Sequence, residues 1–177
     1  MMLISKFGGS SEKAISQLPK NIPSDYKAFL LKYNGGQTPE TSFKANNISS
    51  DIVGFYGVGE VKYSFNDRSI REFENQSFLP IAFDSYGNDI ALSLSDGSIA
   101  FFDHEITTPT VIAKSFCDFI ALVQSKPIDP KHLKPVEQRE QEMLQRGKGD
   151  RITDALRELW RNEIKKYSAI SQEEVCI

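Results

Sequence analysis

The sequence has only two cysteines, two histidines and one tryptophan, and it has no long apolar run. No segment approaches the roughly 18 to 20 consecutive apolar residues that a membrane-spanning helix needs, so we expect no membrane partner. Residues 1–10 lack the apolar core of a secretory signal. Cys117 and Cys176 belong to no Cys-x-x-Cys or Cys/His metal spacing, which argues against a disulfide framework. We therefore expect a cytoplasmic protein.

The net charge is only −3, but acidic residues are concentrated in the middle of the chain. Between Phe78 and Asp118 the sequence has one basic residue, Lys114, and six acidic residues: Asp84, Asp89, Asp96, Asp103, Glu105 and Asp118. From Ile128 onward, acids and bases are equal in number. An acidic segment repels nucleic acid and attracts a basic protein. The charge pattern thus predicts a protein partner and no direct contact with nucleic acid.

Residues 1–126 have the pattern of one α+β domain. Hydrophobic residues make up 40% of the chain and charged residues 25%, which is typical of a globular protein. After Ser24, a candidate N-cap, apolar residues recur at helical spacing at Tyr26, Phe29, Leu30 and Tyr33. Asn34-Gly35-Gly36 then favours a helix end, because these residues tolerate left-handed backbone. The spacing predicts a helix that stops before Asn34.

The next fifty residues give weaker signals. Residues 37–50 are polar and turn-rich, and we expect a loop there, with a short strand as the alternative. Ile52–Tyr56 has the composition of a strand. Phe65 and Ile70 have the spacing of a hydrophobic staple, which predicts a second helix over residues 66–75.

A buried strand and a hairpin are expected in the acidic segment. Phe78–Phe83 is nearly all apolar, as in a strand covered on both faces. Residues 90–103 alternate in polarity on both sides of Asp96-Gly97, a two-residue hairpin signal. A two-residue turn at this position pairs Leu94 with Ile99, and paired residue numbers then sum to 193. Large apolar pairs fall on one face of the hairpin, as expected for a sheet covered on one side.

The last part of the domain reads as a strand followed by a helix. Val111–Ala113 predicts the strand. Ser115, with Asp118 three residues later, is a capping box that starts the helix, whose core positions are Phe116, Phe119, Ile120 and Val123. The whole pattern predicts an α+β fold. We expect a mainly antiparallel twisted sheet of four to six strands, helices chiefly on one face, and a C-terminal helical extension.

The chain after residue 126 differs in character. Residues 127–135 form a Pro-rich linker, and residues 136–177 form the helical extension. A polar helix is expected over 136–146, and a second one begins at Asp150 as N-cap and ends near Tyr167. The second helix has one apolar face, made by Ile152, Leu156, Leu159, Trp160, Ile164 and Tyr167. This face docks on the domain, self-associates or binds a partner, and the sequence leaves the oligomeric state open.

Three stretches, in this order, resemble the SUKH superfamily. The first is Leu18-Pro19 with the helix that ends in Tyr33-Asn34-Gly35-Gly36. The second comprises Gly87-Asn88, Leu92, Leu94, Gly97, Ile99 and Asp103-His104-Glu105. The third is Ile112-Ala113-Lys114-Ser115-Phe116 with Phe119 and Leu122. The resemblance covers about residues 18–124 and excludes the extension.

The resemblance implies a non-enzymatic protein. Yeast members of the superfamily regulate cell-wall synthesis, and bacterial members are largely toxin-immunity proteins. We therefore expect a bacterial immunity protein that binds and neutralises a cognate polymorphic toxin, with a basic, nuclease-type toxin domain as partner. The alternative is a regulatory scaffold of the cell-wall-synthesis type.

Asp103-His104-Glu105 suggests metal binding or acid–base chemistry at first sight. Adjacent residues of a strand point to opposite faces, however, and the other histidine, His132, lies in the linker. We therefore predict no catalytic residue, no metal and no cofactor. The remaining interpretations are a structural pairing of Asp89 with His104 across the hairpin end, or partner recognition. The residues we expect to bind a partner are Tyr56, Asp84, Tyr86, Asp89, Asp103, His104 and Glu105.

Overall fold

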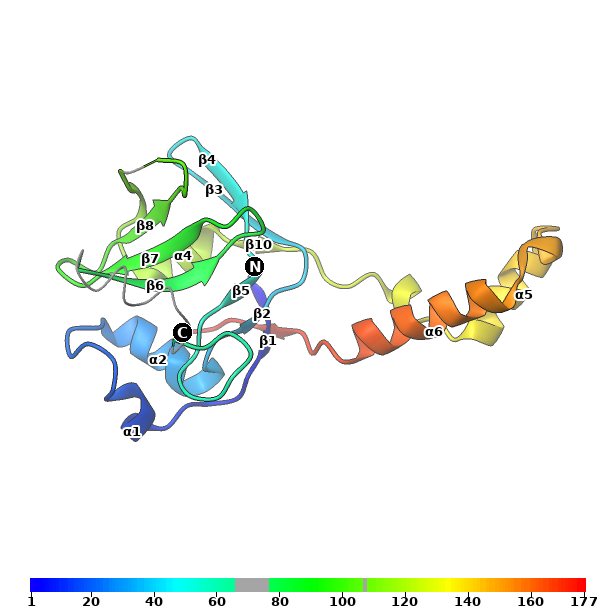
Figure 1. The fold of residues 1–177 in the computed structure, drawn as a ribbon, viewed down its shortest axis with the longest axis horizontal. Helices are drawn as coiled ribbons and strands as arrows, with labels where there is room; N and C mark the ends of the chain where they lie inside the picture. Colours follow the sequence, from blue (N-terminus) through cyan, green and yellow to red (C-terminus); the bar gives the residue numbers. More distant parts are fainter. Residues whose placement is uncertain (66–76, 107) are drawn as a thin grey trace. The chain divides into compact units, whose positions relative to one another are not determined.

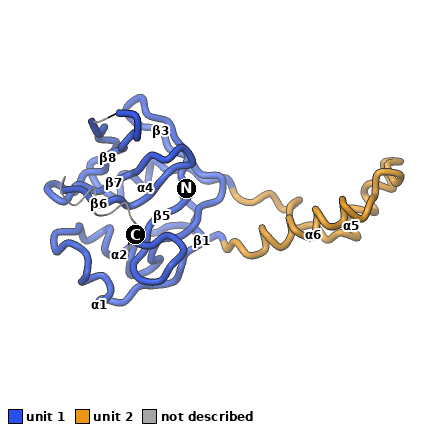
Figure 2. Tube along the Cα trace, in the orientation of Figure 1, with its two compact units in different colours: residues 1–126, 172–177 blue, residues 127–171 orange. Residues whose placement is uncertain are grey.

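The computed structural model describes residues 1–65, 77–106 and 108–177, and it divides into two compact units. Unit 1 comprises Met1–Lys126 together with Gln172–Ile177, and unit 2 is Pro127–Ser171 (Figure 2). The last six residues of the chain thus return to the first unit. The second helix expected over residues 66–75 lies outside the described residues.

The described helices and strands of unit 1 follow each other in this order (Figure 1): β1 Leu3–Lys6, α1 Glu12–Ile15, α2 Ser24–Tyr33, β2 Gly36–Gln37, β3 Thr41–Ala45, β4 Ile48–Asp51, β5 Gly54–Phe55, β6 Phe78–Phe83, β7 Asp89–Ser93, β8 Ile99–Phe102, β9 Thr110–Ala113, α4 Phe116–Leu122, β10 Gln124–Ser125 and β11 Glu173–Glu174. Unit 2 contains two short 3₁₀ helices and two α-helices: η1 Pro130–Leu133, α5 Val136–Gln145, η2 Gly149–Arg151 and α6 Asp154–Ser168.

Unit 1 is built on an eight-stranded sheet in the order β11-β1-β2-β5-β6-β7-β8-β9, beside a three-stranded sheet β10-β3-β4. Every strand pair in both sheets is antiparallel. The predicted α+β class with a mainly antiparallel sheet is confirmed, although the sheet is larger than the four to six strands expected. The extra strands are two-residue pairings such as β2 and β11, which carry no alternation that a sequence pattern could show.

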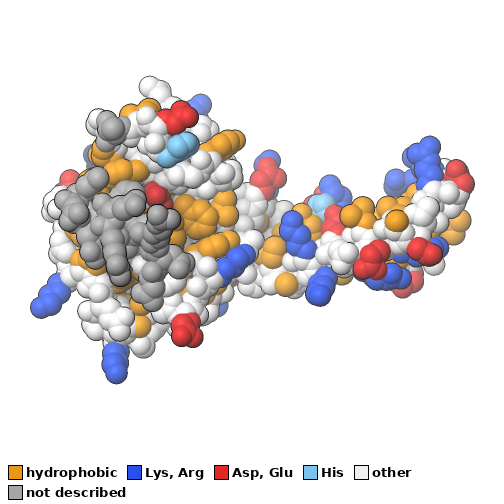
Figure 3. All heavy atoms as spheres, viewed as in Figure 1, with side chains coloured by type: hydrophobic (Ala, Val, Ile, Leu, Met, Phe, Trp, Pro, Cys, Tyr) orange, Lys and Arg blue, Asp and Glu red, His pale blue; other side chains and the backbone are white. Residues whose placement is uncertain are grey.

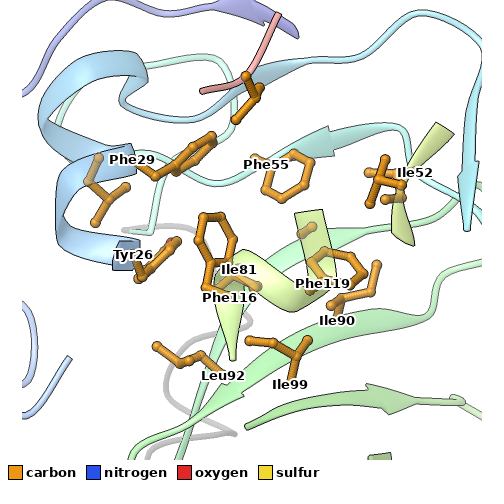
Figure 4. Packing of buried hydrophobic residues seen from close by; sticks show 14 of the residues in the cluster. Tyr26, Phe29, Ile52, Phe55, Ile81, Ile90, Leu92, Ile99, Phe116 and Phe119 are labelled. Carbon is orange, nitrogen blue, oxygen red and sulfur yellow. The ribbon is translucent and has the colours of Figure 1, made fainter. Parts of the chain in front are cut away.

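Aromatic rings from α2 and α4 fill the core. Phe29 is fully buried, and its ring centre lies 5.1 Å from that of Phe116 and 5.4 Å from that of Phe55. Figure 4 shows these rings beside the apolar side chains of β6, β7 and β8. The predicted stripe of α2 and the cap of α4 are confirmed, since Ser115 accepts a hydrogen bond from the backbone N of Asp118 at 3.1 Å.

The register of the β7–β8 hairpin differs from the prediction. Leu92 pairs with Ile99, so paired numbers sum to 191, and the predicted pair of Leu94 with Ile99 is wrong. A two-residue turn of type I′ needs positive φ at both central residues, but only Gly97 has it, at 78°. The Asp96 carboxylate instead accepts hydrogen bonds from the backbone and side chain of Ser98, which closes a longer loop. Because the shift is two residues, the large apolar side chains stay on the predicted face.

Three other boundaries also differ from the sequence-based expectation. Residues 37–50, expected as loop, contain the β3–β4 hairpin, whose two-residue turn Asn46-Asn47 has φ of 45° and 66°. The strand expected over 52–56 is reduced to β5. The last helix is capped by Thr153 and not by Asp150, because η2 intervenes. The asparagine pair was the overlooked hairpin signal, since asparagine tolerates positive φ.

The hydroxyl of Tyr26 is a buried polar group without a hydrogen-bond partner among the described residues. Tyr26 is fully buried, and no described residue offers its hydroxyl a hydrogen-bond partner. Burial raises the pKa of this phenol well above its usual value. Because an unpaired buried hydroxyl costs about 1 to 3 kcal/mol, Tyr26→Phe should raise the free energy of unfolding by about 1 kcal/mol in a urea titration.

Tyr33→Phe is the matched control for that measurement. The Tyr33 hydroxyl bonds to the chain end, where it accepts from the backbone N of Cys176 at 2.9 Å and lies 3.2 Å from the Glu174 carbonyl oxygen. This control should therefore lower the free energy of unfolding. Equal effects of the two substitutions would show that the Tyr26 hydroxyl has a partner.

Candidate partner-binding site

The loop between β6 and β7 is organised around the carboxylate of Asp84. Asp84 is only 3% exposed. Its Oδ1 accepts hydrogen bonds from the backbone N of Tyr86 at 2.9 Å and of Asn88 at 2.8 Å. Its Oδ2 accepts from Ser50 Oγ at 2.6 Å and from Asn88 Nδ2 at 2.7 Å. The carboxylate is thus a buried hub that fixes the backbone of its own loop.

The protonation of Asp84 follows from this environment. Burial by itself would raise the pKa of Asp84, but the hydrogen bonds from Ser50, Asn88 and Tyr86 outweigh it and lower the pKa below its usual value. The carboxylate therefore stays ionised, although none of the described residues forms an ion pair with it.

A second loop, after β8, is joined to the first through Asn88. The side-chain oxygen of Asn88 lies 3.0 Å from the backbone N of His104 and 2.7 Å from His104 Nδ1. Asp103 Oδ1 accepts a hydrogen bond from the backbone N of Glu105 at 2.9 Å. The two loops are therefore held against each other by the hydrogen bonds between Asn88 and His104.

The joined loops display a mixed acidic and apolar surface, which we call the loop platform: Tyr86, Asp103, His104, Glu105 and Ile106. Tyr86 is 72% exposed and Ile106 is 60% exposed, so two large apolar side chains project from a fixed backbone. His104 Nε2 lies 4.0 Å from Glu105 Oε1, and both side chains are largely exposed. Figure 3 shows a histidine beside acidic side chains on the visible face of the larger unit.

Tyr56 and Asp89, the other residues expected to bind a partner, lie partly buried against each other. The Tyr56 hydroxyl is 3.4 Å from Asp89 Oδ1, and the centre of the Tyr56 ring lies 5.2 Å from that of the Phe83 ring. The expected pairing of Asp89 with His104 is wrong, because Asp89 pairs with Phe102 across the hairpin. This follows directly from the two-residue shift of register.

The structure therefore divides the predicted site residues into three groups. It places Tyr86 and the segment Asp103–Glu105 on two loops that Asn88 joins, buries Asp84 within the first loop, and leaves Tyr56 with Asp89 as a pair. The contributions of Asn88 and Ser50 as hydrogen-bond partners, and of Ile106 as an exposed apolar residue, were not anticipated. Gly87-Asn88 was visible as a motif, but its bonds to residues 84 and 104 depend on tertiary contacts.

Within the described ranges, no group of three or more His, Cys, Asp or Glu side chains is placed to hold a metal ion. Both cysteines are free thiols in the structure. Burial and the nearby Asp25 carboxylate raise the pKa of the Cys117 thiol, which disfavours the reactive thiolate. No helix among the described residues is long and apolar enough to cross a membrane. The loop platform itself offers the carboxylates of Asp103 and Glu105, the imidazole of His104, the phenol of Tyr86 and the aliphatic side chain of Ile106.

Comparison with known proteins gives two matches. The model of the SMI1/KNR4 family (SUKH-1) matches residues 11–122. The chain is also similar to the SPbeta prophage-derived uncharacterized protein YokK of Bacillus subtilis (strain 168), with 28% identity over 151 residues, 68% of this chain and 78% of YokK. The family match spans α2, the loop platform and α4, and it ends before unit 2 begins.

Proposed function

Because the chain belongs to the SMI1/KNR4 family (SUKH-1), we propose that it is a bacterial immunity protein that binds and neutralises a cognate toxin. The observation that carries this proposal is the loop platform, an exposed acidic and apolar surface on a backbone fixed by buried hydrogen bonds. The similarity to a prophage-derived protein of Bacillus subtilis supports the bacterial origin that this proposal requires.

The charge of the platform favours a basic toxin domain, such as a nuclease. Asp103 and Glu105 are partly or largely exposed and have no lysine or arginine as an ion-pair partner among the described residues. Unpaired carboxylates create a negative potential that attracts a basic surface and speeds the encounter. A nuclease must bind polyanionic nucleic acid, so its active-site face carries the complementary charge.

Tyr86 supplies the apolar contact in this proposal. Tyrosine is enriched among residues that dominate binding energy, because it offers a large amphipathic surface with few rotatable bonds. The backbone N of Tyr86 is fixed by Asp84, so the loop loses little conformational entropy when the ring is enclosed by a partner.

A regulatory scaffold is the second candidate, since the matching family model carries the SMI1/KNR4 name. The discriminating experiment is co-expression with the protein encoded by the adjacent gene. An immunity protein restores growth to cells that express a toxic neighbour and co-purifies with it. A scaffold does neither.

Neutralising the platform should slow association with that toxin. Asp103→Asn with Glu105→Gln removes two exposed charges, and we expect the association rate to fall roughly threefold to tenfold at low salt, with a smaller effect at high salt. Tyr86→Ala should instead raise the dissociation rate. Surface plasmon resonance at two salt concentrations separates the two effects.

The matched control for the charge effect is Glu137→Gln with Asp150→Asn, which removes the same charge from exposed positions in unit 2. An association rate that responds equally to both double variants would mean that net charge, and not the platform, steers the toxin.

A further inference from the structure

Unit 2 is a helical hairpin without an apolar core. The structure describes every residue of Pro127–Ser171, and none of their side chains is buried. Its α-helices α5 and α6, of 10 and 15 residues, lie against each other (Figure 1). Helices of these lengths are marginal in water unless they cover an apolar face, so other contacts must keep the hairpin closed.

The guanidinium of Arg139, in α5, connects three elements of unit 2. The Arg139 side chain is only 11% exposed. Its Nε donates a hydrogen bond to the carbonyl oxygen of Lys134 at 3.0 Å, and its Nη2 donates to that of Lys131 in η1 at 2.9 Å. Its Nη1 donates to the carboxylate of Glu163 in α6, and the guanidinium lies 5.8 Å from the centre of the Trp160 ring. We call these four contacts the arginine clamp.

Glu163 is held in place from a second side. Its Oε1 lies 2.6 Å from Nδ1 of His132, whose ring stacks on that of Tyr167 with ring centres 4.6 Å apart. The hydrogen bonds from Arg139 and then from His132 lower the pKa of Glu163. The carboxylate therefore stays ionised opposite the guanidinium, which strengthens the hydrogen bond between them.

Two other ion pairs of unit 2 contribute less to keeping the hairpin closed. Arg157 pairs with Glu140 across the two helices, but these side chains are 34% and 27% exposed. Arg161 pairs with Glu158 three residues earlier in the same helix, so this pair does not join two elements. Single ion pairs that reach solvent stabilise a protein little, because water and salt screen them. The arginine clamp is therefore the main connection between η1, α5 and α6.

We infer that unit 2 is a conformational device: a hairpin closed by the arginine clamp, which opens and recloses while unit 1 stays folded. The buried apolar cluster of the described residues lies entirely in unit 1, so unit 1 does not depend on the clamp. Segments of a protein that open locally are those with few buried apolar contacts. Opening separates α6 from η1 and uncovers the Trp160 ring. The loop platform takes no part in this motion, so the inference stands independently of the proposed toxin partner.

Hydrogen exchange of the full chain, followed by mass spectrometry, tests the inference. Amides of α5 and α6 should be protected, but roughly a hundredfold less than those of β6, β7 and β8. Arg139→Lys keeps the charge and loses the planar fork, so exchange in α5 and α6 should rise roughly tenfold while exchange in unit 1 stays unchanged. Arg161→Lys is the matched control, because Arg161 pairs within its own helix, and it should change exchange by less than about twofold. A unit 2 without any protection, equal protection of both units, or equal effects of the two lysine variants would overturn the inference.

The fluorescence of Trp160 provides a second test, since it is the single tryptophan of the chain and reports unit 2 alone. In a urea titration, the Trp160 transition should precede the loss of exchange protection in β6, β7 and β8. Glu163→Gln should lower the urea midpoint of this transition, because it removes the charge that faces Arg139. Glu158→Gln, a change at an exposed carboxylate of the same helix, should leave the midpoint unchanged. Coincident transitions of the two units, or equal midpoints of the two glutamine variants, would exclude the clamp.

Discussion

Gly35→Ala should remove roughly 3 to 5 kcal/mol of the folding free energy, a large share of the roughly 5 to 15 kcal/mol that stabilises a typical domain. Gly35 has a φ of 74°, which L-residues with a side chain rarely adopt. A Cβ there would lie 2.6 Å from the carbonyl oxygens of both Phe55 and Tyr56. Those oxygens belong to the backbone, so the clash can only be relieved by moving the end of α2 away from β5.

The neighbouring Asn34 explains why that position cannot move freely. Asn34 also has positive φ, at 52°, and its side chain bonds both backbone groups of Val58, accepting from the N at 2.8 Å and donating to the O at 3.1 Å. Asn34 is itself buried, so these groups have no water to replace the lost partners. The Tyr33-Asn34-Gly35-Gly36 motif is therefore a backbone lock between the first long helix and the sheet.

Gly59→Ala is the control that separates conformational strain from steric clash. Gly59 has a similar φ of 85°, but a Cβ there would meet no atom within 4 Å. This substitution should cost only about 1 to 2 kcal/mol, the usual penalty for a left-handed L-residue. Urea unfolding followed by circular dichroism measures both variants, and equal midpoints would disprove the lock at Gly35.

Asp84→Ala should destabilise unit 1 by about 3 kcal/mol, because it leaves donors of Ser50, Tyr86 and Asn88 unpaired in a buried site. Asp84→Asn retains one accepting oxygen and should cost about half as much. Glu105→Gln, a change at a side chain that is 80% exposed, should stay within about 0.5 kcal/mol of the wild type. Comparing the Asp84 variants with Glu105→Gln distinguishes a carboxylate that stabilises the fold through hydrogen bonds from one that contributes only negative charge.

The pH dependence gives an independent check on Asp84. Its folded-state pKa is lower than the value of about 3.9 expected in the unfolded chain, so ionised Asp84 adds stability above that unfolded pKa. This contribution is lost as the pH falls through the lower, folded pKa. The gap in unfolding free energy between wild type and Asp84→Asn should therefore be largest near pH 7 and shrink below pH 4. A gap that is constant from pH 7 to pH 3 would contradict the depressed pKa.

Local patterns in the sequence were sufficient where an element is long and its apolar spacing regular. The stripe of α2, the continuous run of β6 and the Ser115 cap all depend on neighbours within a few residues, and the structure confirms each. The large apolar face of β7 and β8 was also predicted correctly, since alternation survives a shift of two residues. The expectation that the opposite face is uncovered was wrong, because Ala91, Ser93 and Ala100 are buried. The loop that sets the register was not predicted correctly, because the Asp96 side chain bonds to Ser98 and favours a different turn.

Exposure at the candidate site was decided by contacts between distant residues. No sequence pattern distinguishes Asp84 from Asp103. Asp84 is buried and accepts a hydrogen bond from Ser50, which is 34 residues away, whereas Asp103 remains near the surface. The return of the chain end is a similar case, with β11 pairing to β1 and Cys176 bonding to Tyr33 across 143 residues. By itself the sequence determined the fold class, the family and the main helices, because helical periodicity and capping are local. Which acids are exposed was left to the tertiary structure, because a carboxylate is buried only where folding brings it enough hydrogen-bond donors to replace water.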